Sequence, residues 1–318
     1  MNKVRQADLK SIFKPKKARR SDMKSIIFSP ALLLMVLPGF ALLILFRYVP
    51  MLNIVVAFKD YNIFQGVWAS PWVGFKHFQV LFTMPKFYSV LGNTFAISAL
   101  KILFGFPAPI ILALIINQVT NAAYKRIVQN IFYLPHFISW VVIAGLCFDI
   151  FSKTGVINAI ASALGFPVKS YLMDPQSIRG VLVITDIWKD VGWGSIIYLA
   201  ALTSIDPELY NAAKIDGAGW LARILHITLP EMADIIITMF ILRLSSVLSV
   251  GLDQILMLDN ARVTDVITVL DTYVWYTGIS KGQYDFTTAV GLFTSLVNAA
   301  FILTANAIVK SKRGEGLW

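Results

Sequence analysis

The sequence has few of the residue types that build disulfides, metal sites or catalytic centres. Its 318 residues include one cysteine, Cys147, so an internal disulfide is excluded. The three histidines, His77, His136 and His226, lack the spacing of metal ligands. Charged residues make up 14% of the chain and hydrophobic residues 57%, whereas soluble domains have about 25% charged residues. This composition predicts a membrane protein.

Six long apolar runs account for the composition and for the mean hydropathy of +0.69. Each is close to the roughly 20 residues with which a helix crosses a bilayer. The runs cover residues 26–46, 90–116, 131–151, 181–202, 232–250 and 287–309. The second run is expected to be broken around Gly105, Pro107 and Pro109.

Two connecting stretches have a distinct composition. Residues 48–88 are rich in aromatic side chains, which is typical of the interface between membrane and water. The stretch 263–279 carries Asp265 and Asp271 and is predicted to be a helix outside the membrane.

Positive charge predicts the orientation. The first apolar run is too long for a signal peptide and has no small-residue cleavage site, so the basic tail 1–25 is expected to be retained. The tails and connections that would then be cytoplasmic hold 16 of the 28 lysines and arginines, more than the outside loops hold. The net charge of +10 is assigned to a membrane surface rather than to nucleic acid. The predicted fold is an all-α integral membrane protein with six transmembrane helices in 26–310 and both termini, including the tail 311–318, in the cytoplasm.

The stretch 206–230, between the fourth and fifth runs, has the pattern of a bent helix pair. Asp206 is a good N-cap, and Pro207 is suited to the first helical position. Gly217 supplies the left-handed residue that ends many helices, and a second short helix then runs toward Pro230. The predicted orientation puts this pair in the cytoplasm.

The helix pair resembles the EAA loop of bacterial ABC-importer membrane subunits. The matching positions are Asn211, Ala212, Ala213, Asp216, Gly217, Ala218, Ile227, Leu229 and Pro230. Glu208 lies one helical turn before Asn211 and is a further candidate of this loop. Asn211 stands where the family has a glutamate. Six spans with this loop between the fourth and fifth are similar to the type I permease plan of sugar importers. The stretch 187–193, leading into 199–202, resembles the branch that imports oligosaccharides or polysaccharide fragments.

The resemblance implies a transport subunit rather than an enzyme, in a bacterial cytoplasmic membrane. The loop would be a coupling helix seated in a cleft of a cytoplasmic ATPase. The chain has no G-x-x-x-x-G-K-[ST] motif, so ATP and magnesium are expected on the ATPase and no cofactor in this chain. The implied partners are two copies of that ATPase, a second homologous permease and an extracytoplasmic solute-binding protein.

Two other functions remain open for a membrane chain of this composition. An ion-coupled secondary sugar transporter would be indicated by inverted repeats or paired broken helices, which the sequence does not show. A membrane-embedded enzyme needs paired carboxylates or an activated nucleophile at membrane depth. Asp190 is interpreted here as a lone carboxylate.

Charged and aromatic residues near the middle of the predicted spans are the candidates for the substrate path. They are Lys101, Trp188, Lys189, Asp190, Trp193 and Arg243. Charges at that depth normally face a cavity or a partner. Asp190 is expected to pair with Arg243 across the fourth and fifth spans. Lys101 and Lys189 would then be uncompensated, which favours an acidic, uronate-containing oligosaccharide as the substrate.

The aromatic and amide candidates have two interpretations. Trp188 and Trp193 either stack on sugar rings or pack against other helices. Asn93 and Asn298 are expected to form hydrogen bonds between helices rather than contacts with a ligand.

Overall fold

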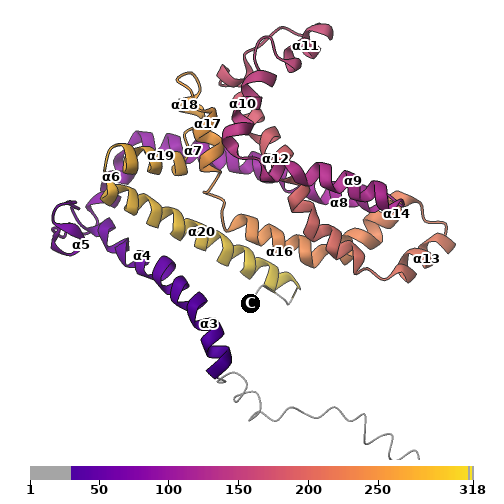
Figure 1. Cartoon of the computed structure of the whole chain (residues 1–318), viewed down its shortest axis with the longest axis horizontal. Helices are drawn as coiled ribbons and strands as arrows, with labels where there is room; N and C mark the ends of the chain where they lie inside the picture. Colours follow the sequence, from indigo (N-terminus) through magenta and orange to yellow (C-terminus); the bar gives the residue numbers. More distant parts are fainter. Residues whose placement is uncertain (1–29, 314–315, 317–318) are drawn as a thin grey trace, which may run out of the picture. The chain divides into compact units, whose positions relative to one another are not determined.

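The computed structural model describes residues 30–313 and residue 316. Every regular element in this described part is a helix (Figure 1), and one isolated bridge pairs Lys59 with Trp72. The chain divides into two units, Met1–Val55 and Val56–Trp318, and each is described by itself. The all-helical prediction is confirmed for the described residues.

The first unit consists of α3 (Pro30–Leu43), a π-helical turn η1 (Ile44–Tyr48), α4 (Val49–Met51) and the start of the 3-10 helix η2 (Leu52–Phe58). Its apolar side chains are exposed all round, as in a helix that faces lipid. The apolar helix extends over Leu33–Phe58, so the predicted end at residue 46 is wrong. The π-helical turn precedes Pro50 and lets the helix accommodate it.

The second unit begins with the short helices α5 (Gly66–Ala69) and α6 (Lys76–Thr83). The next elements are α7 (Pro85–Leu100), η3 (Lys101–Gly105), α8 (Pro107–Asn117), α9 (Ala122–Tyr133), η4 (Leu134–Phe137), α10 (Trp140–Ile150), α11 (Val156–Ala163), η5 (Tyr171–Met173) and α12 (Ile178–Thr203). The chain continues through α13 (Pro207–Ile215), α14 (Trp220–Arg223), η6 (Ile224–Thr228), α15 (Leu229–Glu231), α16 (Ala233–Leu244), α17 (Leu252–Leu258), α18 (Thr264–Ile267), α19 (Leu270–Trp275), η7 (Tyr276–Ser280) and α20 (Tyr284–Arg313).

Three helices of the described part are long and apolar enough to cross a membrane: Leu33–Phe58, Pro85–Asn117 and Tyr284–Ser311. Two bent pairs raise the number to five if each counts as one span. The expected break near Gly105 is wrong, because the π-helical turn η3 carries the helix past Pro107. The count of six spans stays a prediction.

The two bent pairs correct the third and fifth predicted spans. Ala122–Phe137 and Trp140–Ile150 meet at 103°, around the extended residues Ile138 and Ser139. Trp220–Glu231 and Ala233–Leu244 meet at 64°, and α16 ends well before the predicted residue 250. The predicted fourth span, by contrast, lies within the unbroken helix α12.

Three apolar cores hold the second unit together. The first joins α7, α10, α12, α17 and α18 and contains the free thiol of Cys147. The second packs α8 and α12 around Met232, and the third joins α6, α7, α19 and α20. Helix α12 contributes side chains to the first and second cores and so connects them (Figure 1).

The predicted outer helix 263–279 is broken into α18, α19 and η7. The break at Thr268 is held by Asn93, whose amide donates to the carbonyls of Asp265 (2.8 Å) and Thr268 (3.2 Å). Asn298 accepts the backbone N–H of Leu248 at 3.1 Å. Asn93 therefore connects α7 to α18 and the turn after it, and Asn298 connects α20 to the turn that follows α16. Both form hydrogen bonds between segments, as expected.

Candidate functional site

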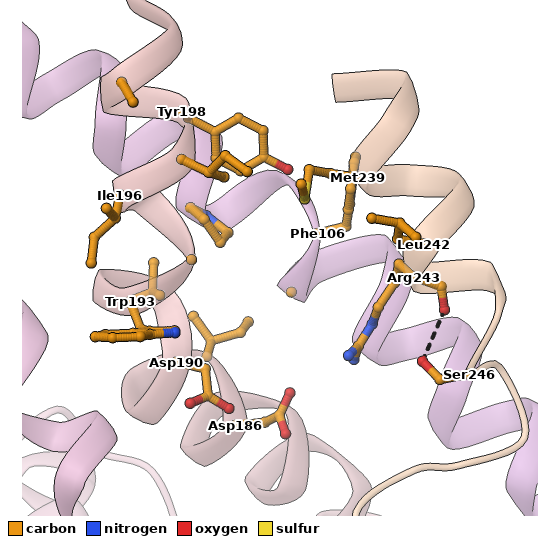
Figure 2. A pocket seen from close by; sticks show the side chains of 17 residues that line it. Phe106, Asp186, Asp190, Trp193, Ile196, Tyr198, Met239, Leu242, Arg243 and Ser246 are labelled. Atoms are coloured by element: carbon orange, nitrogen blue, oxygen red, sulfur yellow. Dashed lines mark hydrogen bonds between the residues drawn. The ribbon is translucent and has the colours of Figure 1, made fainter. Parts of the chain in front are cut away.

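A cavity of about 790 Å³ lies between the start of α8, the middle of α12 and the end of α16 (Figure 2). Apolar side chains such as those of Phe106, Met239 and Leu242 cover much of its wall. Its charged lining residues are Asp186, Asp190 and Arg243. Two carboxylates on one helix thus face a guanidinium on another across a largely apolar space.

Lys101 is buried behind this wall and has three acceptors. Its Nζ donates to Asp186 Oδ1 (2.6 Å), Gln254 Oε1 (2.6 Å) and the Val250 carbonyl (2.8 Å). The expectation that Lys101 is uncompensated is therefore wrong. The prediction overlooked Asp186, which also lies in the fourth apolar run and supplies the missing negative charge.

Asp271, on α19, supports the same network from outside the apolar helices. Its Oδ2 accepts the Val250 N–H at 2.8 Å. Burial raises the pKa of Asp271, and the hydrogen bonds from the Val250 and Gly251 N–H groups oppose that shift. The Val250 peptide is therefore held on both sides, by Asp271 through its N–H and by Lys101 through its carbonyl.

Lys189 points away from the cavity into the bend that precedes α10. Its Nζ donates to the carbonyls of His136 (2.7 Å) and Ile138 (2.6 Å) and is 3.4 Å from that of Pro135. It also lies 5.7 Å from the centre of the Trp140 ring. A cation suits the free carbonyls at the end of η4. The Lys189 ammonium is thus held by backbone carbonyl groups. The prediction that Lys189 is an uncompensated charge is therefore wrong as well.

Asp190 pairs with His136 rather than with Arg243. Its Oδ1 lies 2.8 Å from His136 Nδ1, because the bend at η4 brings that histidine against α12. The predicted pair across the fourth and fifth spans is therefore wrong. Within the described residues Arg243 has no ion-pair partner, and Figure 2 shows its side chain reaching from α16 into the cavity. His136 was not identified from the sequence.

The two candidate tryptophans differ in position. The Trp193 ring stacks on His136, with ring centres 4.6 Å apart and 2° between the planes. It lines the cavity and remains 48% exposed. Trp188 is similarly exposed but does not line the cavity. Of the two, only Trp193 presents an aromatic surface to a ligand in this cavity.

Close packing of α12 fixes the position of these side chains. A Cβ atom on Gly192 would lie 2.0 Å from the backbone oxygen of Phe132. The absence of a side chain therefore lets the bent segment approach α12 closely enough for Lys189 and Asp190 to reach it.

The helix pair predicted at 206–230 is present. Asp206 caps α13 by accepting the Glu208 N–H at 2.9 Å, and Gly217 has a φ of +76°. The second helix begins at Trp220, and Tyr210 Oη meets Thr228 Oγ1 at 3.0 Å, which ties the two helices together.

The surface of this pair carries the remaining candidate residues. Glu208, Asn211, Ala212, Asp216, Gly217 and Pro230 are exposed, and Ala213, Ala218, Ile227 and Leu229 are half-buried. Five large apolar side chains are also exposed: Leu209, Ile215, Trp220, Leu221 and Leu225, with Ile215 the most exposed at 87%. Such a surface is typical of a site that binds another protein.

Residues 105–313 match the family described as the binding-protein-dependent transport system inner membrane component. The chain belongs to this family. It is 43% identical to protein LplB of Bacillus subtilis (strain 168), over 90% of this chain and 91% of that protein. It is 41% identical to the polygalacturonan/rhamnogalacturonan transport system permease protein YteP of the same organism, over 96% of both.

The fold of this family member is shared with a solved transporter. A chain in the crystal structure of a bacterial alginate ABC transporter, in complex with an alginate pentasaccharide-bound periplasmic protein, superposes with a TM-score of 0.83. The two are 37% identical, over 92% of this chain and 99% of that one. Together with the relatives named as permeases, this confirms a transport subunit rather than an enzyme. Asp190 is not a lone carboxylate, because Asp186 lies one turn away on α12. Asp186 pairs with Lys101 and Asp190 with His136, so each carboxylate already has a partner within the protein.

Proposed function

We propose that this chain is the membrane-spanning permease subunit of an ATP-driven importer of oligosaccharides, including acidic, uronate-containing fragments. The observation that carries the proposal is the combined similarity to YteP and to the alginate transporter chain. Both of these are named for acidic polysaccharides, and both match along nearly the whole chain.

The cavity supports an acidic substrate, but through a different residue from those predicted. Lys101 and Lys189 are occupied within the protein. Arg243 lines the cavity without an ion-pair partner in the described part of the chain. A guanidinium matches the geometry of a carboxylate and can donate two parallel hydrogen bonds to it. The exposed part of the Trp193 ring would give a sugar ring an apolar surface in the same cavity.

The helix pair 206–230 is our candidate for the contact with the ATPase. Its exposed apolar residues Ile215, Trp220 and Leu221 suit a groove in a partner protein. ATP and magnesium would bind the ATPase, of which two copies would serve this chain and a second, homologous permease. An extracytoplasmic solute-binding protein would deliver the sugar, in keeping with the family description.

The proposed topology has six spans in 26–310 of a bacterial cytoplasmic membrane, with the tails 1–25 and 311–318 and the helix pair in the cytoplasm. Single cysteines at the exposed positions Ala122 and Gly219 should react with a reagent only from the cytoplasmic side. Cysteines at Lys153 and Lys281, also exposed, should react only from outside. The native Cys147 is buried and gives little background. Reaction of position 219 from outside would exclude contact between the helix pair and a cytoplasmic ATPase.

The function itself is tested by reconstitution. The chain, its partner permease and an ATPase are placed in liposomes, and uptake of a labelled oligogalacturonate is followed with a sugar-binding protein outside. The proposal predicts uptake that requires ATP inside and continues when ion gradients are collapsed. Uptake driven by an ion gradient without ATP would support the secondary transporter instead.

A further inference from the structure

Residues 59–75, here called the aromatic loop, form a tightly built turn. Lys59 is 8% exposed, and its Nζ donates to the carbonyls of Val67 (2.8 Å) and Trp68 (2.9 Å). These carbonyls belong to α5, so the ammonium caps a one-turn helix. The Asn62 N–H donates to Ser70 Oγ at 3.1 Å across the base of the turn. The loop is therefore held in shape by its own polar groups.

The side chains that this turn presents are apolar and exposed. Phe64 is 96% exposed, and Trp68 is 77% exposed. The neighbouring exposed apolar residues are Ile63, Trp72 and Phe75. Residues 61–75 contain no charged residue. Of the two charged residues of the loop, Lys59 is buried and Asp60, at its start, is exposed. Soluble surfaces rarely carry an apolar patch of this kind without a partner.

The loop lies where two long apolar helices end. One of them, Leu33–Phe58, ends at the residue before Lys59. The other, Tyr284–Ser311, starts beside the loop: the Tyr61 N–H donates to Asp285 Oδ2 at 3.3 Å, and the Tyr61 and Tyr284 rings are 6.3 Å apart. If these helices cross the bilayer, their common end lies at its boundary, where tyrosine and tryptophan are enriched.

We propose that the aromatic loop is an interfacial anchor that inserts Phe64 and Trp68 into the lipid headgroup region. A docking surface for a soluble protein normally has a polar rim around its apolar centre. Here the segment from Tyr61 to Phe75 has no charge, and the exposed charges Asp60 and Lys76 lie only at its two ends. Because the loop also lies at the ends of two long apolar helices, lipid is the partner that matches. The anchor fixes the depth of the turn and resists tilting of the helices on either side of it.

A fluorescent label sensitive to polarity tests this anchor. The full chain carrying Phe64→Cys is labelled and placed in nanodiscs of phosphatidylethanolamine and phosphatidylglycerol. Ile215→Cys is the matched control, because Ile215 is equally apolar and 87% exposed but lies on the helix pair 206–230. Trp68→Cys provides a second site within the loop. Neither Phe64 nor Trp68 is buried, so neither change should disturb folding.

The anchor predicts blue-shifted emission at positions 64 and 68. It also predicts several-fold stronger quenching there by phospholipids with a headgroup-level nitroxide than at position 215, and weaker quenching by iodide in the water. Strong iodide quenching at 64 and 68 without lipid quenching would overturn the proposal. Protection that arises only after a soluble sugar-binding protein is added would also overturn it, in favour of a protein docking surface.

Discussion

The ammonium of Lys101 and the carboxylate of Asp186 form a buried ion pair, with Nζ and Oδ1 2.6 Å apart. The pair joins the π-helical turn η3 to α12, and the same ammonium reaches Val250, beyond the end of α16. Lys101 therefore ties η3 and α12 to the segment that follows α16. Its charge holds the cavity wall and is not free to bind a substrate.

Replacing one member of this pair should destabilise the protein strongly. Lys101→Met leaves Asp186 without its cation in a largely buried position, a change that costs about 3–5 kcal/mol in comparable sites. Lys86→Met is the control, because the Lys86–Asp265 pair is exposed and should contribute about 1 kcal/mol or less. Thermal unfolding of the purified variants measures both effects. Equal losses would show that Lys101 is not a structural cation.

The turn between α13 and α14 should require glycine at one position but not at the other. Gly217 has a φ of +76°, where a side chain costs about 1–2 kcal/mol, whereas Gly219 has a φ of −66°. Gly217→Val should insert normally but lose substrate-stimulated ATP hydrolysis, and Gly219→Ala should retain it. Stimulation at the wild-type level in Gly217→Val would mean that the shape of the helix pair does not transmit the conformational change.

Two glycines on α12 allow a matched test of its packing. A Cβ at Gly192 would meet the Phe132 backbone at 2.0 Å, whereas one at Gly180 would meet nothing within 4 Å. Gly192→Ala should therefore lower the free energy of unfolding by about 1–3 kcal/mol. Gly180→Ala should be neutral or raise it by about 0.5–1 kcal/mol. Denaturation of the two variants side by side decides whether α12 and the bent segment are in contact.

Local sequence signals predicted the helix pair 206–230 well. An aspartate N-cap, a proline at the first helical position and a glycine at the turn each act within a few residues, so tertiary contacts hardly alter them. The roles of Asn93, which is buried, and Asn298, which is half-buried, were also predictable, because an amide among apolar helices has few partners other than a backbone group.

The charge pairs could not be predicted in the same way. Asp190 and Arg243 lie on the predicted neighbouring spans, but the bend at η4 brings His136 closer to Asp190. Pro135 and the N-cap Ser139 mark that bend in the sequence, but they do not give its angle or the side chain it brings to α12. The π-helical turn at Lys101 could not be predicted either. A glycine and two prolines in 105–109 are equally compatible with a broken helix and with a continuous helix that contains a π-helical turn. Asp186 was available in the sequence, and a complete count of charges in the fourth run would have found it.

The most direct test of the account compares ATP-driven uptake of acidic and neutral oligosaccharides of equal length. Wild type and Arg243→Gln are measured in the reconstituted transporter, with Lys281→Gln as a control at an exposed position away from the cavity. The account predicts that wild type and the control favour the acidic sugar, and that Arg243→Gln loses this preference while neutral uptake is kept. Equal uptake of both sugars by wild type, or full uronate uptake by Arg243→Gln, would contradict it.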